Sequence, residues 1–250
     1  MSPPFPLNPS GPDVVGLERC FMKITFLGHA AFFIETAQTS LLIDPFLTGN
    51  PKAAASAADF SPEYILLTHG HSDHVGDTLP IARRAGSTVI TTFELGQWLG
   101  KKGAKVSAQN HGGWHKYPFG DVKFTFAIHS SSMEDERGNP IYLGEPAGIV
   151  LVADGYALYH AGDTALFSDM QLIAEEQPID VALLPIGEHF VMGPRDAARA
   201  VDFLKPKQAV PIHYGTFPVL VGDPKEFARF CEGKPTKVNI LAPGESITLG

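Results

Sequence analysis

Three histidines and one aspartate fall within six residues of this chain, in the segment Thr68-His69-Gly70-His71-Ser72-Asp73-His74. The segment directly follows the apolar run 64–67, which is typical of a buried strand. Side chains two residues apart in an extended segment point the same way, so His69 and His71 can face one ion. Asp73 and His74 follow the turn and can reach a second ion beside the first.

The residue types in this segment favour a metal site. Neutral imidazole and carboxylate groups are ligands for zinc, manganese and iron. Burying so many ionisable groups together costs free energy unless something pairs with them. The alternative is a solvated polar loop that happens to be rich in histidine.

The segment resembles the metal-binding motif of the metallo-β-lactamase superfamily, a group of mostly metal-dependent hydrolases. That pattern requires three further ligands downstream, a His, an Asp and a His, each at the end of a strand. The chain has His129, Asp163 and His213 in that order. The resemblance implies one ion held by His69, His71 and His129, a second held by Asp73, His74 and His213, and Asp163 as the bridge between them.

Three more segments resemble one branch of the superfamily, which contains the ascorbate-6-phosphate lactonase and relatives known only as metal-dependent hydrolases. These segments are 24–30, 42–46 and 211–217. The resemblance covers about residues 22–250. It implies an α/β fold of four layers, an αββα sandwich in which two sheets face each other, helices flank them and the metal ions lie at one edge.

The pattern of the chain independently indicates an α/β protein. Short apolar runs alternate with segments of helical spacing. Continuous runs such as 148–152 and 181–184 suit strands covered on both faces. One helix is expected directly behind the histidine-rich segment, with its stripe at Val75, Leu79, Ala82 and Ala85. We expect one hydrolase domain over residues 22–250, preceded by a Pro-rich extension over residues 1–21.

The composition and net charge of the chain restrict the kinds of partner that it can bind. The formal net charge of −8 argues against a sequence-independent grip on nucleic acid, which requires a basic surface. Cys20 and Cys231 form no C-x-x-C pair and imply no disulfide framework, which fits a reducing compartment. No apolar run approaches membrane-spanning length, and the N-terminus lacks signal-peptide character. We expect a cytoplasmic protein with a small-molecule substrate and without a nucleic-acid or membrane partner; the sequence leaves a homo-oligomer open.

The expected chemistry is hydrolysis assisted by two divalent ions. Ligand type points to Zn²⁺, although Mn²⁺ and Fe²⁺ accept the same set. Such ions lower the pKa of water from about 15.7 toward about 7, so a metal-bound hydroxide can attack at neutral pH. Asp73 is expected to bind metal and to orient this nucleophile. The substrate would be a small ester, lactone or phosphorylated metabolite; the alternatives are a phosphodiesterase or nuclease, and a non-catalytic metal-binding protein.

Four other residues are candidates for contact with substrate. His29 follows the first strand and would contact substrate or stabilise charge, or else be a hydrogen-bonded turn residue. His189 could supply a leaving-group acid, with a plain surface loop as the alternative. Tyr214 could donate to a substrate oxygen or simply pack, and Arg195 could bind an anionic group or face water.

Two further features follow from position in the chain. Asp44 ends an apolar run and could orient a ligand histidine through a hydrogen bond, with a structural role in the turn before Pro45 as the alternative. The polar segment 130–146 follows His129 directly and could cover the pocket, or be a solvated connection.

Overall fold

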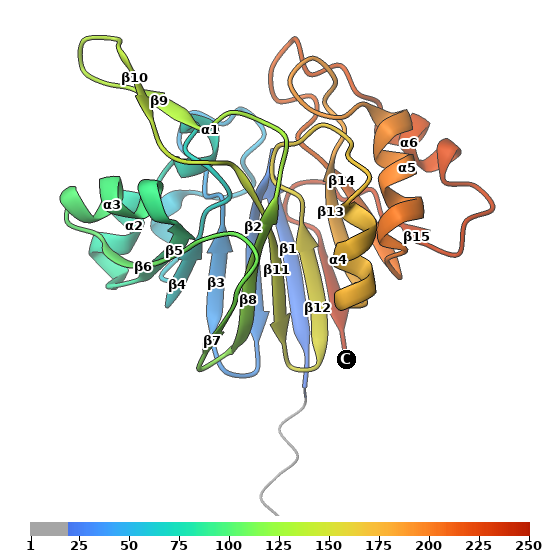
Figure 1. Ribbon diagram of the computed structural model, residues 1–250, viewed down its shortest axis with the longest axis horizontal. Coiled ribbons are helices and arrows are strands. Elements are labelled where there is room, and N and C mark those ends of the chain that lie inside the picture. The colour runs from blue at the N-terminus through green and yellow to red at the C-terminus, as the bar shows by residue number, and fades with distance from the viewer. Residues whose placement is uncertain (1–19) are drawn as a thin grey trace, which may run out of the picture.

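The computed structural model describes residues 20–250, in which two seven-stranded sheets face each other (Figure 1). The strands of the first sheet, in spatial order, are β16 (Ser246–Leu249), β1 (Met22–Gly28), β2 (Ala31–Thr36), β3 (Ser40–Ile43), β4 (Tyr64–Leu66), β5 (Thr88–Thr92) and β6 (Lys105–Gln109). Pairing is antiparallel from β16 to β3 and parallel from β3 to β6.

The second sheet has the same mixed character. Its strands, in spatial order, are β15 (Lys237–Val238), β14 (Gln208–Ile212), β13 (Val181–Pro185), β12 (Tyr156–His160), β11 (Ala147–Ala153), β8 (Gly120–Phe126) and β7 (Trp114–Tyr117). The strands from β12 to β15 are parallel, and those from β12 to β7 are antiparallel. A separate hairpin of β9 (Ser132–Glu134) and β10 (Pro140–Tyr142) projects from the body (Figure 1).

Helices cover the outer face of each sheet. The first sheet carries α1 (Ser72–Val75), α2 (Thr78–Ala85), α3 (Phe93–Lys101) and the 3₁₀ turn η1 (Ala57–Asp59), and the second carries α4 (Met170–Glu176), α5 (Pro194–Leu204) and α6 (Pro224–Phe230). One buried apolar cluster fills the space between the sheets, with Phe32 and Phe124 among its largest members. A second cluster lies between the second sheet and its helices, and a third lies between the first sheet and its helices. The predicted four-layer αββα sandwich is therefore confirmed.

The strand ends position the site. The chain leaves β1, β3, β4, β8, β12 and β14 along one edge, the upper edge in Figure 1, and the segments that follow carry the candidate polar residues. Three of these residues have left-handed backbones directly after their strands: His29 (φ 60°), Asp44 (φ 44°) and His213 (φ 57°). This conformation is uncommon outside glycine and is often found at functional sites.

The helix expected behind the histidine-rich segment is in fact two helices. The chain breaks between α1 and α2 at Gly76, whose φ is +39°. A β-carbon on Gly76 would lie 2.5 Å from the carbonyl oxygen of Pro45, so the close approach of that turn requires glycine. Periodicity alone could not show this break, because the obstructing backbone is 31 residues upstream.

Two other expectations concern the ends and the surroundings of the domain. The predicted extension over residues 1–21 lies outside the described residues except for its last two. Within residues 20–250, no helix has both the length and the apolar character needed to cross a membrane.

Candidate metal centre

The loop between β4 and α1 brings four of the predicted ligands to the sheet edge. His69 is fully buried, and His71 is the N-cap residue of α1. Asp73 and His74 then lie on that short helix, with His74 fully buried and Asp73 partly open to solvent. One turn of chain thus presents two histidines on its extended part and a carboxylate and a histidine on its helical part.

All seven predicted metal ligands converge at this edge, together with His29. They form two groups, and within each group the candidate ligand atoms all lie within 4.8 Å of one another. The groups are His69, His71, His129 and Asp163 (group A) and His29, Asp73, His74 and His213 (group B). Residues separated by up to 184 positions in the chain are therefore brought into one site.

Asp163 lies between the two groups. Its Oδ1 is 3.3 Å from His74 Nε2, and its Oδ2 is 3.1 Å from His213 Nε2. The same Oδ2 is 3.5 Å from His129 Nε2, and 4.0 Å from His69 Nε2. A carboxylate that faces histidines of both groups has the position that a bridging ligand needs.

Several atoms of this site have unmet hydrogen-bonding capacity. His74 Nε2, Asp163 Oδ1 and both ring nitrogens of His213 are buried without a hydrogen-bond partner. Buried polar atoms without partners are rare and costly in folded proteins. Imidazole nitrogens and carboxylate oxygens that converge in this way fit divalent metal ions, which would use the same lone pairs.

The histidines of group A are suited to bind metal at neutral pH. Burial lowers the pKa of His69 well below its usual value, and the neighbouring His74 lowers it further. Burial also lowers the pKa of His71 and of His129. Their rings are therefore neutral at pH 7, and a neutral imidazole has the lone pair that a metal ligand must offer.

The carboxylates and His74 form a charged set. Burial tends to raise the pKa of Asp163, but His213 and His74 outweigh it and hold that pKa well below the usual range. Burial likewise acts against ionisation of Asp73, yet His29 and His74 keep its pKa low. For His74, burial lowers the pKa, but Asp163 and Asp44 together raise it well above the usual value. Both carboxylates are therefore ionised at neutral pH.

Asp44 supports the site from behind. Its Oδ2 accepts hydrogen bonds from His74 Nδ1 at 2.8 Å and from the Thr68 hydroxyl at 2.6 Å. Its Oδ1 accepts the backbone N–H of Thr68 at 2.9 Å. The Thr68 hydroxyl also lies 2.9 Å from His69 Nδ1, so one carboxylate reaches a histidine of each group. Because Nδ1 of His74 and Nδ1 of His69 make these contacts, the Nε2 atom of each ring is left to face the candidate metal centre.

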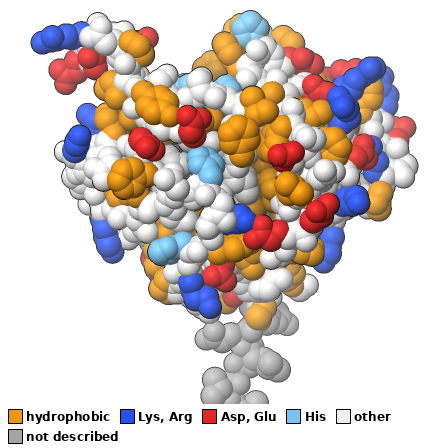
Figure 2. Space-filling view, in the orientation of Figure 1, with side chains coloured by type: hydrophobic (Ala, Val, Ile, Leu, Met, Phe, Trp, Pro, Cys, Tyr) orange, Lys and Arg blue, Asp and Glu red, His pale blue; other side chains and the backbone are white. Residues whose placement is uncertain are grey.

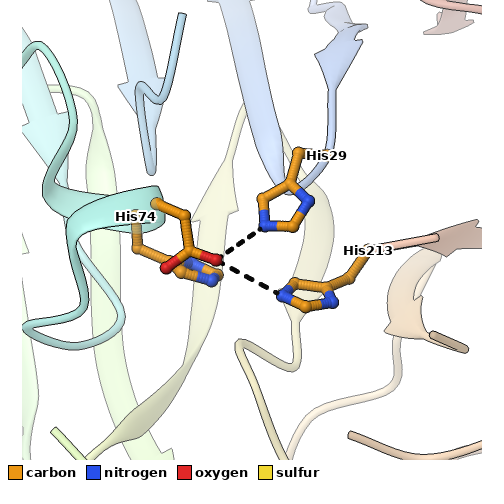
Figure 3. Close-up of side chains that lie close together, drawn as sticks. His29, His74 and His213 are labelled. Atoms are coloured by element: carbon orange, nitrogen blue, oxygen red, sulfur yellow. Dashed lines mark hydrogen bonds and ion pairs between the residues drawn. The ribbon is translucent and has the colours of Figure 1, made fainter. Parts of the chain in front are cut away.

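His29 is a hydrogen-bonded residue that follows β1 and lies behind Asp73. Its ring is almost fully buried, with Nδ1 2.9 Å from the Thr216 hydroxyl and Nε2 3.1 Å from Asp73 Oδ2. Figure 3 shows His29, His74 and His213 arranged around the same space. Phe46 and Phe217 pack edge-on against the His29 ring, at 5.7 and 5.6 Å between centroids. Burial lowers the pKa of His29 to about 4, so the ring is neutral and holds Asp73 from its buried side.

The site is open to solvent beside His71 of group A and Asp73 of group B. A hollow of about 610 Å³ is lined by His71 and Asp73, by the adjacent Ser72, and by the hairpin residues Ser132, Met133, Glu134 and Pro140. The predicted cover over 130–146 therefore takes the form of the β9–β10 hairpin, which forms one wall of this hollow.

The hairpin is joined tightly to the metal-binding loop. The Ser131 hydroxyl accepts a hydrogen bond from the backbone N–H of Gly70 at 3.0 Å and donates to the Leu143 carbonyl at 3.3 Å. A β-carbon on Gly70 would lie 2.6 Å from Leu143 Cβ, so glycine is required there. The Ser130 hydroxyl is 3.3 Å from His71 Nε2, which leaves His71 Nδ1 to face His69.

Two of the predicted contact residues lie away from the two groups, and the third, Tyr214, directly follows His213 of group B. His189 is exposed and stacks edge-on with Phe190 at 4.4 Å. Tyr214 is half-buried against the core between the second sheet and its helices, and it lines a hollow of about 400 Å³ together with His29. Arg195 is exposed on α5, with its guanidinium 5.4 Å from the Phe230 ring. None of the three has a hydrogen bond or ion pair with group A or group B among residues 20–250.

Sequence reasoning did not single out Thr68, Ser131 or Thr216. Each is a hydroxyl residue whose partner comes from another part of the chain. Thr68 and Ser131 lie one or two residues from a predicted ligand, and this adjacency was the available signal. Thr216 contacts His29 from 187 positions away, and its place in the segment 211–217, three residues after His213, was the available signal.

Comparisons with known proteins agree with this geometry. Residues 23–213 match the family model described as the β-lactamase superfamily domain. A UPF0173 metal-dependent hydrolase of Geobacillus thermodenitrificans is 51% identical over 228 residues, which cover 91% of this chain and 100% of the relative. The chain belongs to the metallo-β-lactamase superfamily.

Other members of this superfamily share the whole domain. A UPF0173 metal-dependent hydrolase of Lysinibacillus sphaericus is 49% identical and covers 90% of this chain and 99% of its own length. The structure of Igni18, a metallo hydrolase from the archaeon Ignicoccus hospitalis, has a TM-score of 0.84 and 38% identity, and covers 92% of this chain and 99% of that chain. The superfamily predicted from the histidine-rich segment is confirmed, and the chain is a metal-dependent hydrolase.

Proposed function

We propose that this metallo-β-lactamase-superfamily member hydrolyses a small ester, lactone or phosphorylated metabolite at groups A and B. The observation that carries the proposal is the position of Asp163 between two sets of buried histidines, several of whose lone pairs have no partner in the protein. The His69, His71 and His129 set would hold one divalent ion, and the Asp73, His74 and His213 set a second. The ligand types suit zinc, and also manganese or iron.

The ions would supply the reactive chemistry. When bound, two divalent ions activate a water molecule and polarise the scissile carbonyl or phosphoryl group. The protein contributes the positions of the groups around them. Asp73 is held by His29 on its buried side and faces the hollow with its exposed side, which suits a ligand that also orients the attacking water.

The rest of the site determines how the substrate enters. Phe46 and Phe217 pack against His29 of group B, whereas His71 and Asp73 line the hollow beside the β9–β10 hairpin. We infer that the substrate approaches from this hollow, with the bond to be cleaved near His71 and His129. Glu134 is the only charged residue that the hairpin contributes to the lining, which gives no support to a nuclease reading.

A panel of chromogenic substrates tests the proposal. Protein stripped with chelator and reloaded with zinc or manganese would be assayed on an aryl acetate, a lactone, a phosphomonoester and a phosphodiester. We expect metal-dependent hydrolysis of at least one ester, lactone or phosphomonoester, with a loss of at least 100-fold in His129→Ala and no loss in the control His115→Ala. Hydrolysis that survives His69→Ala, or a fully loaded protein inactive on the whole panel, would refute it.

A further inference from the structure

A second hollow lies on the outer face of sheet 2, between β8 and α4, and the proposed function does not use it. Its volume is about 290 Å³. Three buried residues line it, Phe124, Thr125 and Val150, together with apolar side chains that are open to solvent. Figure 2 shows apolar side chains gathered on this face, in the area where Figure 1 places β8 and α4.

The exposed apolar lining is unusual for a protein surface. Trp114 is 39% exposed, Phe126 54% and Leu172 53%, and all three line the hollow. A concave surface region lined by large exposed apolar side chains is often a binding site. The hollow also has a polar part of its lining, formed by His111, Lys123, Glu176 and Gln177.

The wall of the hollow is held in place by a charged group on α4. Glu176 accepts a hydrogen bond from the indole N–H of Trp114 at 2.7 Å and forms an ion pair with Lys123. The Lys123 ammonium also lies 5.7 Å from the centre of the Trp114 ring. The indole is thus fixed between β7 and α4 and not free to collapse over the hollow, so the cavity is formed before any ligand binds.

An apolar strip connects this hollow to the metal centre. Phe126 lines the hollow, Ile128 is 44% exposed, and His129 of group A is the next residue. Three residues span at most about 10 Å, and Ile128 and His129 lie in a bend beyond the end of β8. Ile128 is bonded through its N–H to the Thr164 hydroxyl and through its carbonyl to Ala165 N–H, so the strip is fixed to the loop that follows Asp163.

We propose that the hollow binds the apolar tail of the substrate, an alkyl or aryl chain carried by the ester or lactone group that reaches the metal centre. This inference rests on the proposed function and narrows its substrate class. Continuity through Ile128 and Phe126 favours a chain attached to the reacting group. The alternative is that this face is a dimer interface with a second copy of the protein, which would need to bury about 800 Å² on each partner. The experiments below distinguish the two.

Binding of a neutral apolar dye, N-phenyl-1-naphthylamine, tests the hollow without any need for catalysis. Leu172→Glu puts a carboxylate into the apolar wall, and Val221→Glu is the matched control because Val221 is 70% exposed and outside the hollow. We expect Leu172→Glu to weaken dye binding at least tenfold, octanol to compete better than ethanol, and Val221→Glu to bind like the wild type. Equal dye binding by Leu172→Glu and the wild type would overturn the proposal.

The chain-length dependence of hydrolysis tests the link to the metal centre. For the metal-loaded protein we expect kcat/KM on p-nitrophenyl octanoate to exceed that on the acetate at least tenfold, and Leu172→Glu to reduce this ratio at least fivefold. An unchanged ratio with metal-dependent acetate hydrolysis intact would overturn the tail site alone. No hydrolysis of either ester would count against the proposed function, and the dye would still decide whether the hollow binds apolar chains. A wild-type dimer that Leu172→Glu converts to a monomer would also overturn the tail site.

Discussion

The Nδ1 of His74 donates a hydrogen bond of 2.8 Å to Oδ2 of Asp44, and both side chains are fully buried. The same oxygen accepts the Thr68 hydroxyl, which in turn contacts His69. Asp44 therefore sets the orientation of a histidine in each of the two groups from outside both. Such hydrogen bonds to metal ligands are commonly worth 10–100-fold in metal affinity.

Replacement of Asp44 is expected to weaken metal binding without removing a ligand. Asp44→Asn keeps the shape of the side chain but replaces one acceptor oxygen with a donor. The new N–H group opposes the donors of His74 and the Thr68 hydroxyl in one orientation and the backbone N–H of Thr68 in the other. We predict a 10–100-fold loss of affinity for zinc, measured by competition with a chelating dye. Asp169→Asn is the control, because Asp169 is exposed and contacts Ser168 with its side chain. Unchanged affinity in Asp44→Asn would contradict the orienting role.

The charge on His74 predicts a pH dependence for the metal-free protein. Asp163 and Asp44 outweigh burial and raise the His74 pKa above its unfolded value of about 6.5. A raised pKa in the folded state contributes stability that is fully present below pH 6.5 and is lost as pH rises through the folded pKa. The unfolding midpoint of chelated protein should therefore fall as the pH rises above about 6.5, and less steeply in Asp44→Asn. A midpoint that rises over this window in the chelated protein would contradict the assignment.

Gly70 should tolerate a side chain only if its neighbour is made smaller. A β-carbon at Gly70 would meet Leu143 Cβ and Cδ1, both at 2.6 Å. We predict that Gly70→Ala costs about 1–3 kcal/mol in the free energy of unfolding, since overpacking a close contact displaces the loop. The double variant Gly70→Ala/Leu143→Gly removes both contacted carbons and should lose less than the sum of the two single changes, as measured by urea unfolding. Additive losses would show that the two residues do not meet.

The two cysteines should differ in reactivity. Burial raises the pKa of Cys231 to about 11, so its thiolate is scarce at neutral pH, and its side chain lies within the core beside α6. Cys20 is exposed. Iodoacetamide at pH 8 should add one label quickly to the native protein and a second only after unfolding, as read by intact mass. Rapid addition of two labels to the folded protein would contradict the described burial of Cys231.

Local sequence was sufficient for the parts of the site that lie close together in the chain. His69, His71, Asp73 and His74 are adjacent, and their spacing on an extended segment and one helical turn already indicates two directions of approach. The distant ligands His129, Asp163 and His213 came from resemblance, because nothing in the spacing of the chain shows that β8, β12 and β14 end at the same edge.

The role of the residues that orient the metal ligands could not be predicted without the tertiary structure. The bond from Asp44 to His74 requires the parallel register of β3 on β4, in which Ile43 pairs with Leu66. The sequence left the role of Asp44 open for that reason. Strands β5 (Thr88–Thr92) and β6 (Lys105–Gln109) were not marked by apolar runs, because three of the five residues of β5 are threonines and β6 is a partly exposed strand at the end of the sheet.

The most direct test of the account is the number of metal ions per chain. Protein equilibrated with zinc or manganese, freed of loose metal on a desalting column, would be measured by plasma mass spectrometry beside His129→Ala and His213→Ala. The account predicts two ions in the wild type and about one in each variant, because each change removes a ligand from one group only. A wild type that retains no ion, or variants that retain both, would contradict it.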